Sequence, residues 1–160
     1  MPNNQLSPIQ RYEQALASGD FSEDAQQRQA MQYLEKVYQQ ILDNQAKQKG
    51  LFSFLKRTEP PKGLYMWGGV GRGKTWMMDM FFESLPPQNK MRMHFHHFMQ
   101  RVHAELNALQ GQQDPLQKVA NSIHNEAQTI CFDEFFVSNV SDAMILGDLF
   151  TMLFHKSITL

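Results

Sequence analysis

The stretch LYMWGGVGRGKTWMMDMFF, from Leu64 to Phe82, sets four glycines, a lysine and a threonine between two apolar runs. Its central residues, 68–75, satisfy the spacing G-x-x-x-x-G-K-[ST]. Glycine permits backbone conformations that are closed to other residues, so the N–H groups of such a loop can turn inward around an anion. The pattern predicts a phosphate cradle, and a glycine-rich turn that binds no nucleotide is the alternative.

Each part of this loop has a use in binding a triphosphate. Lys74 supplies a point charge for the β and γ phosphates, and Thr75 offers a hydroxyl to Mg²⁺. The helix that begins there directs its positive end toward the same phosphates. Arg72, inside the loop, either touches phosphate or is simply solvated. We therefore predict bound ATP and Mg²⁺, with the phosphate-binding residues Gly68, Gly69, Val70, Gly71, Arg72, Gly73, Lys74 and Thr75.

A second motif, TICFDEFF at residues 129–136, is an apolar run that ends in two carboxylates. It has the form of a Walker B segment, in which Asp133 would hold Mg²⁺ together with Thr75. Glu134 would polarise the water that attacks the γ phosphate, so we predict Glu134 and Lys74 as the catalytic residues. A carboxylate beside the metal-binding aspartate favours ATP hydrolysis over phosphate transfer to an acceptor substrate.

Short apolar runs alternate with helical patterns after residue 62. This alternation predicts a parallel sheet with helices on both faces, the α/β fold of P-loop NTPases. Asp114 is expected to cap its helix in a capping-box-like spacing with Gln117. The predicted strands are 63–67, 91–97, 129–133 and 157–160, and the predicted helices are 74–84, 98–109, 115–126 and 142–155.

The region before the loop has a different character. Residues 5–49 carry apolar side chains at helical spacing, with a capped start at Ser22, Glu23 and Asp24. We expect the apolar face to dock on the neighbouring core. The stretch GLFSFLKRTEPPK contains a glycine and two prolines, which is typical of a linker. The predicted organisation is a helical segment at 1–49, a linker loop at 50–62 and a partial ATPase domain at 63–160.

Composition narrows the possible partners and location. Fifteen basic and sixteen acidic residues give a net charge of -1, which supplies no general attraction for nucleic acid or an anionic membrane. The single cysteine, Cys131, lies in an apolar run and is expected in the core. Neither a secretory signal nor a long apolar run is present, so we predict a cytoplasmic protein without a transmembrane segment.

Three histidines invite a metal hypothesis. On a strand at 91–97, His94 and His96 would share a face while His97 pointed away. No cysteine or suitably spaced carboxylate completes a site, so packing or a partner contact is the preferred interpretation.

Four stretches together resemble one family. They are GLYMWGGVGRGKTWMMDMFF at 63–82, RMHFHHFMQRVHAEL at 92–106, DPLQKVA at 114–120 and CFDEFFVSNVSDAMILGDLF at 131–150. The chain closely resembles the ZapE cell-division ATPases, the bacterial members of the AFG-like branch of AAA+ proteins. HFHHFM and CFDEFFVSNVSDAM are the most specific parts, because a generic P-loop ATPase need not contain them.

This resemblance implies ATP hydrolysis coupled to cell division, with the tubulin-like FtsZ of the division ring as partner and the division site as the place of action. In AAA+ proteins a polar sensor ends the fourth strand, and an arginine finger and a lid follow it. The chain stops at SITL, so we expect an N-terminal fragment whose sheet is truncated at the fourth strand and whose ATPase activity is weak or absent. The resemblance leaves open whether the longer protein forms a homo-oligomer.

Two further functions compete with a remodelling ATPase. The first is a nucleotide-gated interaction module, in which ATP orders a surface and hydrolysis only resets it. The second is a helicase-loader-like AAA+ protein, which the absence of a clustered Lys/Arg stripe disfavours.

Overall fold

The computed structural model describes residues 5–19, 21–48 and 61–160. These residues form two compact units, Met1–Pro86 and Pro87–Leu160, each of which is described by itself. The first contains α1 (Pro8–Ala17), α2 (Ala25–Gln48) and α3 (Lys74–Ser84). The second contains β1 (Lys90–His94), α4 (Phe95–Ala108), α5 (Pro115–Glu126), β2 (Thr129–Asp133) and α6 (Val140–His155).

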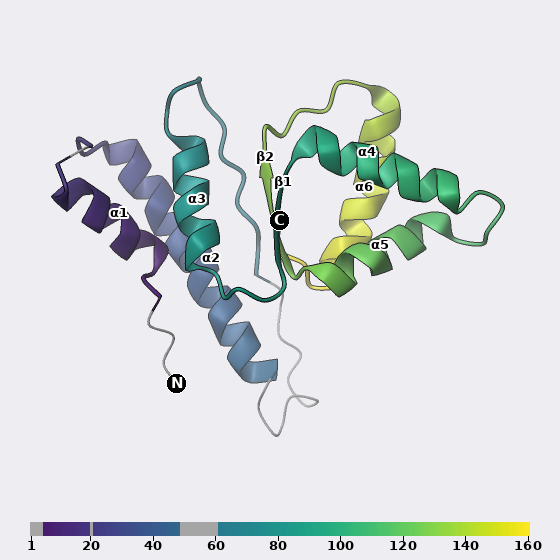
Figure 1. Cartoon of the computed structure of the whole chain (residues 1–160), viewed down its shortest axis with the longest axis horizontal. Helices are drawn as coiled ribbons and strands as arrows, with labels where there is room; N and C mark the ends of the chain where they lie inside the picture. The colour runs from purple at the N-terminus through teal and green to yellow at the C-terminus, as the bar shows by residue number, and fades with distance from the viewer. Residues whose placement is uncertain (1–4, 20, 49–60) are drawn as a thin grey trace. The chain divides into compact units, whose positions relative to one another are not determined.

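In the first unit, α1, α2 and α3 pack against one another (Figure 1). Ser7 starts α1 with a capping box, and the Asp24 carboxylate accepts the N–H groups of Gln26 and Gln27 at the start of α2. The helix does have a capped start, as predicted, but the cap is Asp24 rather than Ser22. The predicted apolar face is also buried, together with one side of α3: Tyr12, Met31, Leu34, Val37, Tyr38, Ile41, Met77, Met78, Met80 and Phe81.

The predicted strand at 63–67 is wrong. These residues have no regular secondary structure, although α3 begins and ends where the sequence predicted. A strand persists only where its N–H and C=O groups pair with a neighbouring strand, and the sheet of the described residues holds only β1 and β2. Apolar composition made 63–67 a candidate, but pairing decides whether such a candidate becomes a strand.

The second unit is built on two parallel strands. Lys90 lies opposite Thr129 and His94 lies opposite Asp133, so both strands end at the same edge. Helices α4, α5 and α6 lie on one side of this sheet (Figure 1). Cys131 is buried, as predicted. The core consists of Phe95, Phe98, Met99, Val102, Val119, Ala120, Ile123, Ala127, Ile130, Leu146, Leu149, Leu153 and Ile158.

The predicted boundary between the second strand and its helix is also wrong. The strand ends at His94, and α4 begins at Phe95 rather than at residue 98. Phe95, Phe98, Met99 and Val102 are all buried, and this i, i+3, i+4, i+7 spacing belongs to a helix face. The short polar and apolar alternation of MRMHFHH had suggested a strand instead.

Three smaller expectations also need correction. Asp114 precedes α5 in a left-handed conformation with φ 50°, and its side chain makes no capping hydrogen bond, so the capping box with Gln117 is absent. The last helix starts at Val140 because Asn139 accepts the N–H of Asp142 at 2.7 Å. The predicted strand at 157–160 is reduced to one parallel bridge between Thr159 and Thr129.

Most of the predicted linker, residues 50–60, lies outside the described residues. The predicted division of the chain at 50–62 therefore stays a prediction. Among the described residues, no helix has both the length and the apolar character to cross a membrane.

Candidate phosphate-binding loop and carboxylate pair

The loop before α3 turns through backbone conformations that favour glycine. Gly71 and Gly73 both have φ 78°, and Gly73 occupies the N-cap position of α3. A Cβ at Gly73 would also come within 3.0 Å of the Gln27 amide nitrogen. Any other residue at this position would therefore meet both backbone strain and a close contact.

Lys74 lies at the start of α3 with its side chain folded over the loop. Its ammonium donates to the carbonyl oxygens of Gly68 at 2.9 Å and Gly69 at 2.7 Å. Thr75 follows on the exposed side of the first helical turn. The positive end of α3, the Lys74 charge and the Thr75 hydroxyl consequently belong to the same turn of chain.

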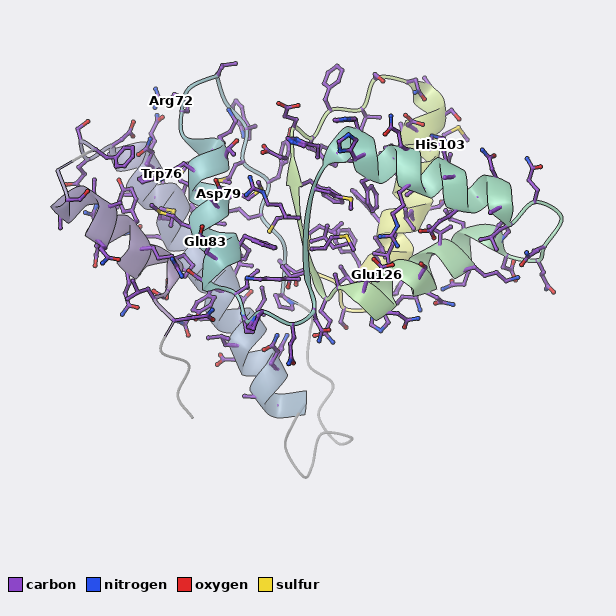
Figure 2. The ribbon with its side chains drawn as sticks, in the orientation of Figure 1. Arg72, Trp76, Asp79, Glu83, His103 and Glu126 are labelled. Carbon is purple, nitrogen blue, oxygen red and sulfur yellow. The ribbon has the colours of Figure 1, made fainter. Side chains whose placement is uncertain are left out.

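Arg72 lies at the loop end of α3, with Trp76 farther along the helix (Figure 2). Its guanidinium donates to the Gln26 side chain and lies 3.5 Å from an Asp24 carboxylate oxygen. The sequence left Arg72 either on phosphate or in solvent. The structure gives its side chain a third location, against the start of α2.

The carboxylate pair lies at the end of β2 in the second unit. Asp133 is mostly buried and lies 3.5 Å from the Arg92 guanidinium, which comes from the neighbouring strand β1. One Asp133 oxygen accepts the N–H of Glu134 at 3.2 Å. Glu134 itself is exposed and has φ 53°. A non-glycine residue in this left-handed region carries strain of about 1–3 kcal/mol, which is a common property of functional sites.

These residues fit a nucleotide and a divalent cation. The loop provides glycine backbone at positive φ, a helix N-terminus and a lysine, all of which suit phosphate. The carboxylate and hydroxyl oxygens of Asp133 and Thr75 are the hard donors that Mg²⁺ prefers. The loop belongs to the first unit and the carboxylate pair to the second.

The three histidines gather more closely than the sequence predicted. Because α4 begins at Phe95, the rings of His96 and His97 lie 3.9 Å apart, and His94 is 5.9 Å from His96 and 6.0 Å from His97. The prediction that His97 points away is therefore wrong. Among the described residues, no group of three histidine, cysteine or acidic side chains has a geometry that could hold a metal ion.

Sequence reasoning missed the residues that hold the functional side chains in place. Arg92 is adjacent to Asp133 only because of the parallel register, which pairs its strand with β2. Asp24 and Gln26 are more than forty positions before Arg72, and no local pattern links them. The register could have been inferred once both strands were correctly bounded, whereas the contact with α2 had no signal in the sequence.

The sequence was compared with known proteins. Residues 6–160 match the AFG1-like ATPase family. The cell division protein ZapE of Escherichia coli K12 is 47% identical over 167 residues, an alignment that covers 97% of this chain and 44% of that protein. An uncharacterised protein of Schizosaccharomyces pombe is 29% identical, over 96% of this chain and 42% of its own length. Lactation elevated protein 1 homolog B of Danio rerio is 40% identical over 61% of this chain. No solved structure matches.

The match to the family covers nearly the whole chain, and it includes both the glycine loop and the carboxylate pair. The fold is that of an α/β protein with parallel strands, and the chain belongs to the AFG1-like ATPase family. It spans less than half the length of the Escherichia coli relative.

Proposed function

We propose that this chain is the nucleotide-binding part of an ATPase that hydrolyses ATP with Mg²⁺. The observation that carries the proposal is the left-handed glycine at the N-cap of α3, followed at once by Lys74 and Thr75. Membership of the AFG1-like ATPase family supports it. A glycine turn that binds no ligand has no need to combine a left-handed glycine cap with a lysine and a threonine directly after it.

In this proposal, residues 68–75 bind the phosphates through backbone N–H groups and the Lys74 ammonium. Thr75 and Asp133 are the Mg²⁺ ligands, directly or through water, and the ion when bound neutralises charge on the phosphates. Glu134 orients the attacking water and accepts its proton. Arg92, whose guanidinium lies 3.5 Å from an Asp133 oxygen, holds the Asp133 carboxylate in position.

We further propose that the fold is a P-loop AAA+ sheet with helices on both faces. The parallel bridge at Thr159 supports this, because it adds a third chain segment beside β2.

The proposed biological role is ATP-dependent action on the cell-division machinery, at the division site in the cytoplasm. It rests on the similarity to a cell division protein, and FtsZ is the partner we propose. A nucleotide-gated interaction module is the second candidate. The exposure of Glu134 favours this second candidate. A catalytic carboxylate works best where water is excluded, whereas an interaction module needs no such carboxylate.

The test uses the longer protein with ATP and Mg²⁺, because the chain by itself is expected to have weak or absent ATPase activity. Lys74→Ala removes a charged contact to phosphate, so we expect ATP affinity measured by calorimetry to fall about tenfold to a hundredfold. Glu134→Gln should leave ATP affinity within about twofold and lower hydrolysis at least about a hundredfold. Lys62→Ala, which removes an exposed lysine before the loop, is the control and should change neither quantity.

Two outcomes would contradict the proposal. ATP affinity unchanged by Lys74→Ala would exclude phosphate binding at this loop. Capture of FtsZ by Glu134→Gln with ATP, together with normal division in cells carrying only that variant, would favour the interaction module over the ATPase.

A further inference from the structure

The start of α2 meets the phosphate loop through a single carboxylate. One oxygen of Asp24 accepts the N–H groups of Gln26 and Gln27, at 2.8 Å and 3.3 Å, which caps α2. The other oxygen lies 3.5 Å from the Arg72 guanidinium. The Gln26 side chain accepts a second hydrogen bond from the same guanidinium. Asp24 therefore joins the end of one helix to the middle of the loop.

A second contact holds the loop backbone itself. The Gln27 side-chain amide donates to the carbonyl oxygen of Arg72 at 3.2 Å. That carbonyl lies between Gly71 and Gly73, and because glycine lacks a Cβ, this part of the loop has more backbone conformations open to it than other residues would allow. The side chain and the backbone of Arg72 are consequently both bound to the first turn of α2.

Trp76, in the first turn of α3, continues the same contact. The Trp76 ring stacks on Phe21 with centroids 4.5 Å apart, and it lies 5.9 Å from the Tyr12 ring. Figure 2 shows Trp76 following Arg72 along the chain at the loop end of α3. A movement of the loop would therefore alter the surroundings of this indole.

We propose that Asp24, Gln26 and Gln27 are positioning residues that hold the phosphate loop through Arg72, so that the start of α2 sets nucleotide affinity. This inference rests on the proposed function, because it assumes that the loop binds ATP. Glycine-rich loops must lose conformational freedom when they bind phosphate, and a loop that is already held loses less of it. Arg72 thus acts on phosphate indirectly, through the shape of the backbone.

The competing interpretation is a direct contact between the Arg72 guanidinium and phosphate. A double-mutant cycle separates the two. Arg72→Met keeps the length of the side chain and removes its charge, and Asp24→Asn keeps the helix cap while removing the partner charge. If Arg72 acts through Asp24, each variant weakens ATP binding about three- to tenfold, and the double variant is hardly weaker than either one.

The control is Arg28→Gln. Arg28 lies in the same first turns of α2 and pairs with Glu23 and Glu13, but those partners are not in the loop. We expect it to change ATP affinity by less than about twofold, since it breaks an exposed ion pair of the same kind elsewhere. A general loss of stability in α2 would affect all of these variants alike.

The fluorescence of Trp76 supplies a spectroscopic measurement of the loop. Its shift on adding ATP would not change if Arg72 only stabilised the fold. In the Trp67→Phe background, ATP is expected to shift the emission of Trp76, and Arg72→Met should abolish most of that shift at saturating ATP. Arg28→Gln should retain it. Gln27→Leu, which removes the backbone contact alone, should behave like Arg72→Met in this measurement.

The outcomes distinguish this inference from the proposed function. ATP binding with additive effects of Arg72→Met and Asp24→Asn would assign Arg72 to phosphate and overturn the inference alone. An unchanged affinity in Asp24→Asn and Gln27→Leu would overturn it as well. No ATP binding by the unaltered protein would overturn the proposed function, and the inference with it.

Discussion

Two five-residue runs, GLYMW at 63–67 and TICFD at 129–133, have the same apolar character, yet only the second is a strand. The second pairs with β1 in register along its whole length. The first is followed by the loop and by a helix whose buried side contacts α1 and α2. Intrinsic preference therefore marks where a strand can form, whereas a paired neighbour determines where it does form.

Each unit positions its own candidate functional residues, and the two units do so in different ways. In the first unit, helices hold the loop, through Asp24, Gln27 and Trp76. In the second unit, strand pairing holds Asp133, because its ion-pair partner Arg92 is on the adjacent strand. The stability of the loop should accordingly depend on helix packing, and that of the carboxylate pair on the sheet and its core.

The largest expected effect tests whether the two units unfold separately. Phe98 is fully buried against Phe132 in the second unit, and Phe98→Ala should lower the free energy of unfolding of that unit by about 3–5 kcal/mol. Both tryptophans, Trp67 and Trp76, lie in the first unit. Tryptophan fluorescence should therefore change little, while the circular dichroism transition moves to lower denaturant.

Met31→Ala is the matched variant in the first unit, where Met31 is fully buried. It should lower the fluorescence midpoint by an amount corresponding to about 2–5 kcal/mol and leave the second unit folded. A single coincident transition in both variants would mean that the two units unfold together, and would contradict separate stabilisation of the loop and the carboxylate pair.

A smaller effect should appear at the carboxylate pair. The left-handed backbone conformation of Glu134 carries strain, so Glu134→Gly should raise the free energy of unfolding by about 0.5–1 kcal/mol. The same variant should lack the proposed ATP hydrolysis. Asn89→Gly is the control, because Asn89 also has a positive φ, of 63°, but asparagine tolerates it. Equal effects at the two positions in urea denaturation would show that Glu134 is not specially strained.

The smallest expected effect is a difference in alkaline stability within α2. Burial, and next the negative charge of Glu35, raise the pKa of Tyr38 above its ordinary value of 10.0. Neutral Tyr38 stabilises the fold below that value, and this contribution is lost as the pH rises through the higher folded pKa. Tyr38→Phe should reduce the fall in Tm between pH 9 and about pH 11.

Tyr33→Phe is its control, because Tyr33 lies in the same helix with 47% of its surface exposed. This substitution should leave the alkaline fall in Tm as it is in the unaltered protein. Identical curves for Tyr38→Phe and the unaltered protein would contradict the assigned cause.

Much of the fold could be predicted where local signals agree. Lys74–Ser84, Pro115–Glu126 and Thr129–Asp133 have the predicted bounds, because glycine, proline or a polar residue marks their ends. The start of α4 was mispredicted because the residues at 91–97 fit two patterns. They show the short polar and apolar alternation of a strand, and some of them also begin the apolar face of a helix. Phe95, with its buried partners three, four and seven positions later, carried the correct signal.

The candidate site divides in the same way. The spacing of glycine and lysine in the sequence is enough to predict the residues of the loop, because a phosphate-binding loop needs these residues at fixed offsets. The direction of the Arg72 side chain could not be predicted, because Asp24 and Gln26 reach it through the packing of α2 on α3. Contacts between distant parts of a chain depend on tertiary packing, which no local pattern encodes.

The contacts between α1 and the C-terminal end of α3 have a practical consequence for the design of shorter versions of this protein. Arg11 of α1 donates to the Ser84 hydroxyl at 3.1 Å and pairs with Glu83 at 3.1 Å, while α2 covers the opposite end of the helix. A piece trimmed to begin at residue 63 would lose both neighbours. The methionines and Phe81 of α3 would then face water, so such a piece should aggregate on expression, whereas one that begins before Ser7 should remain in solution.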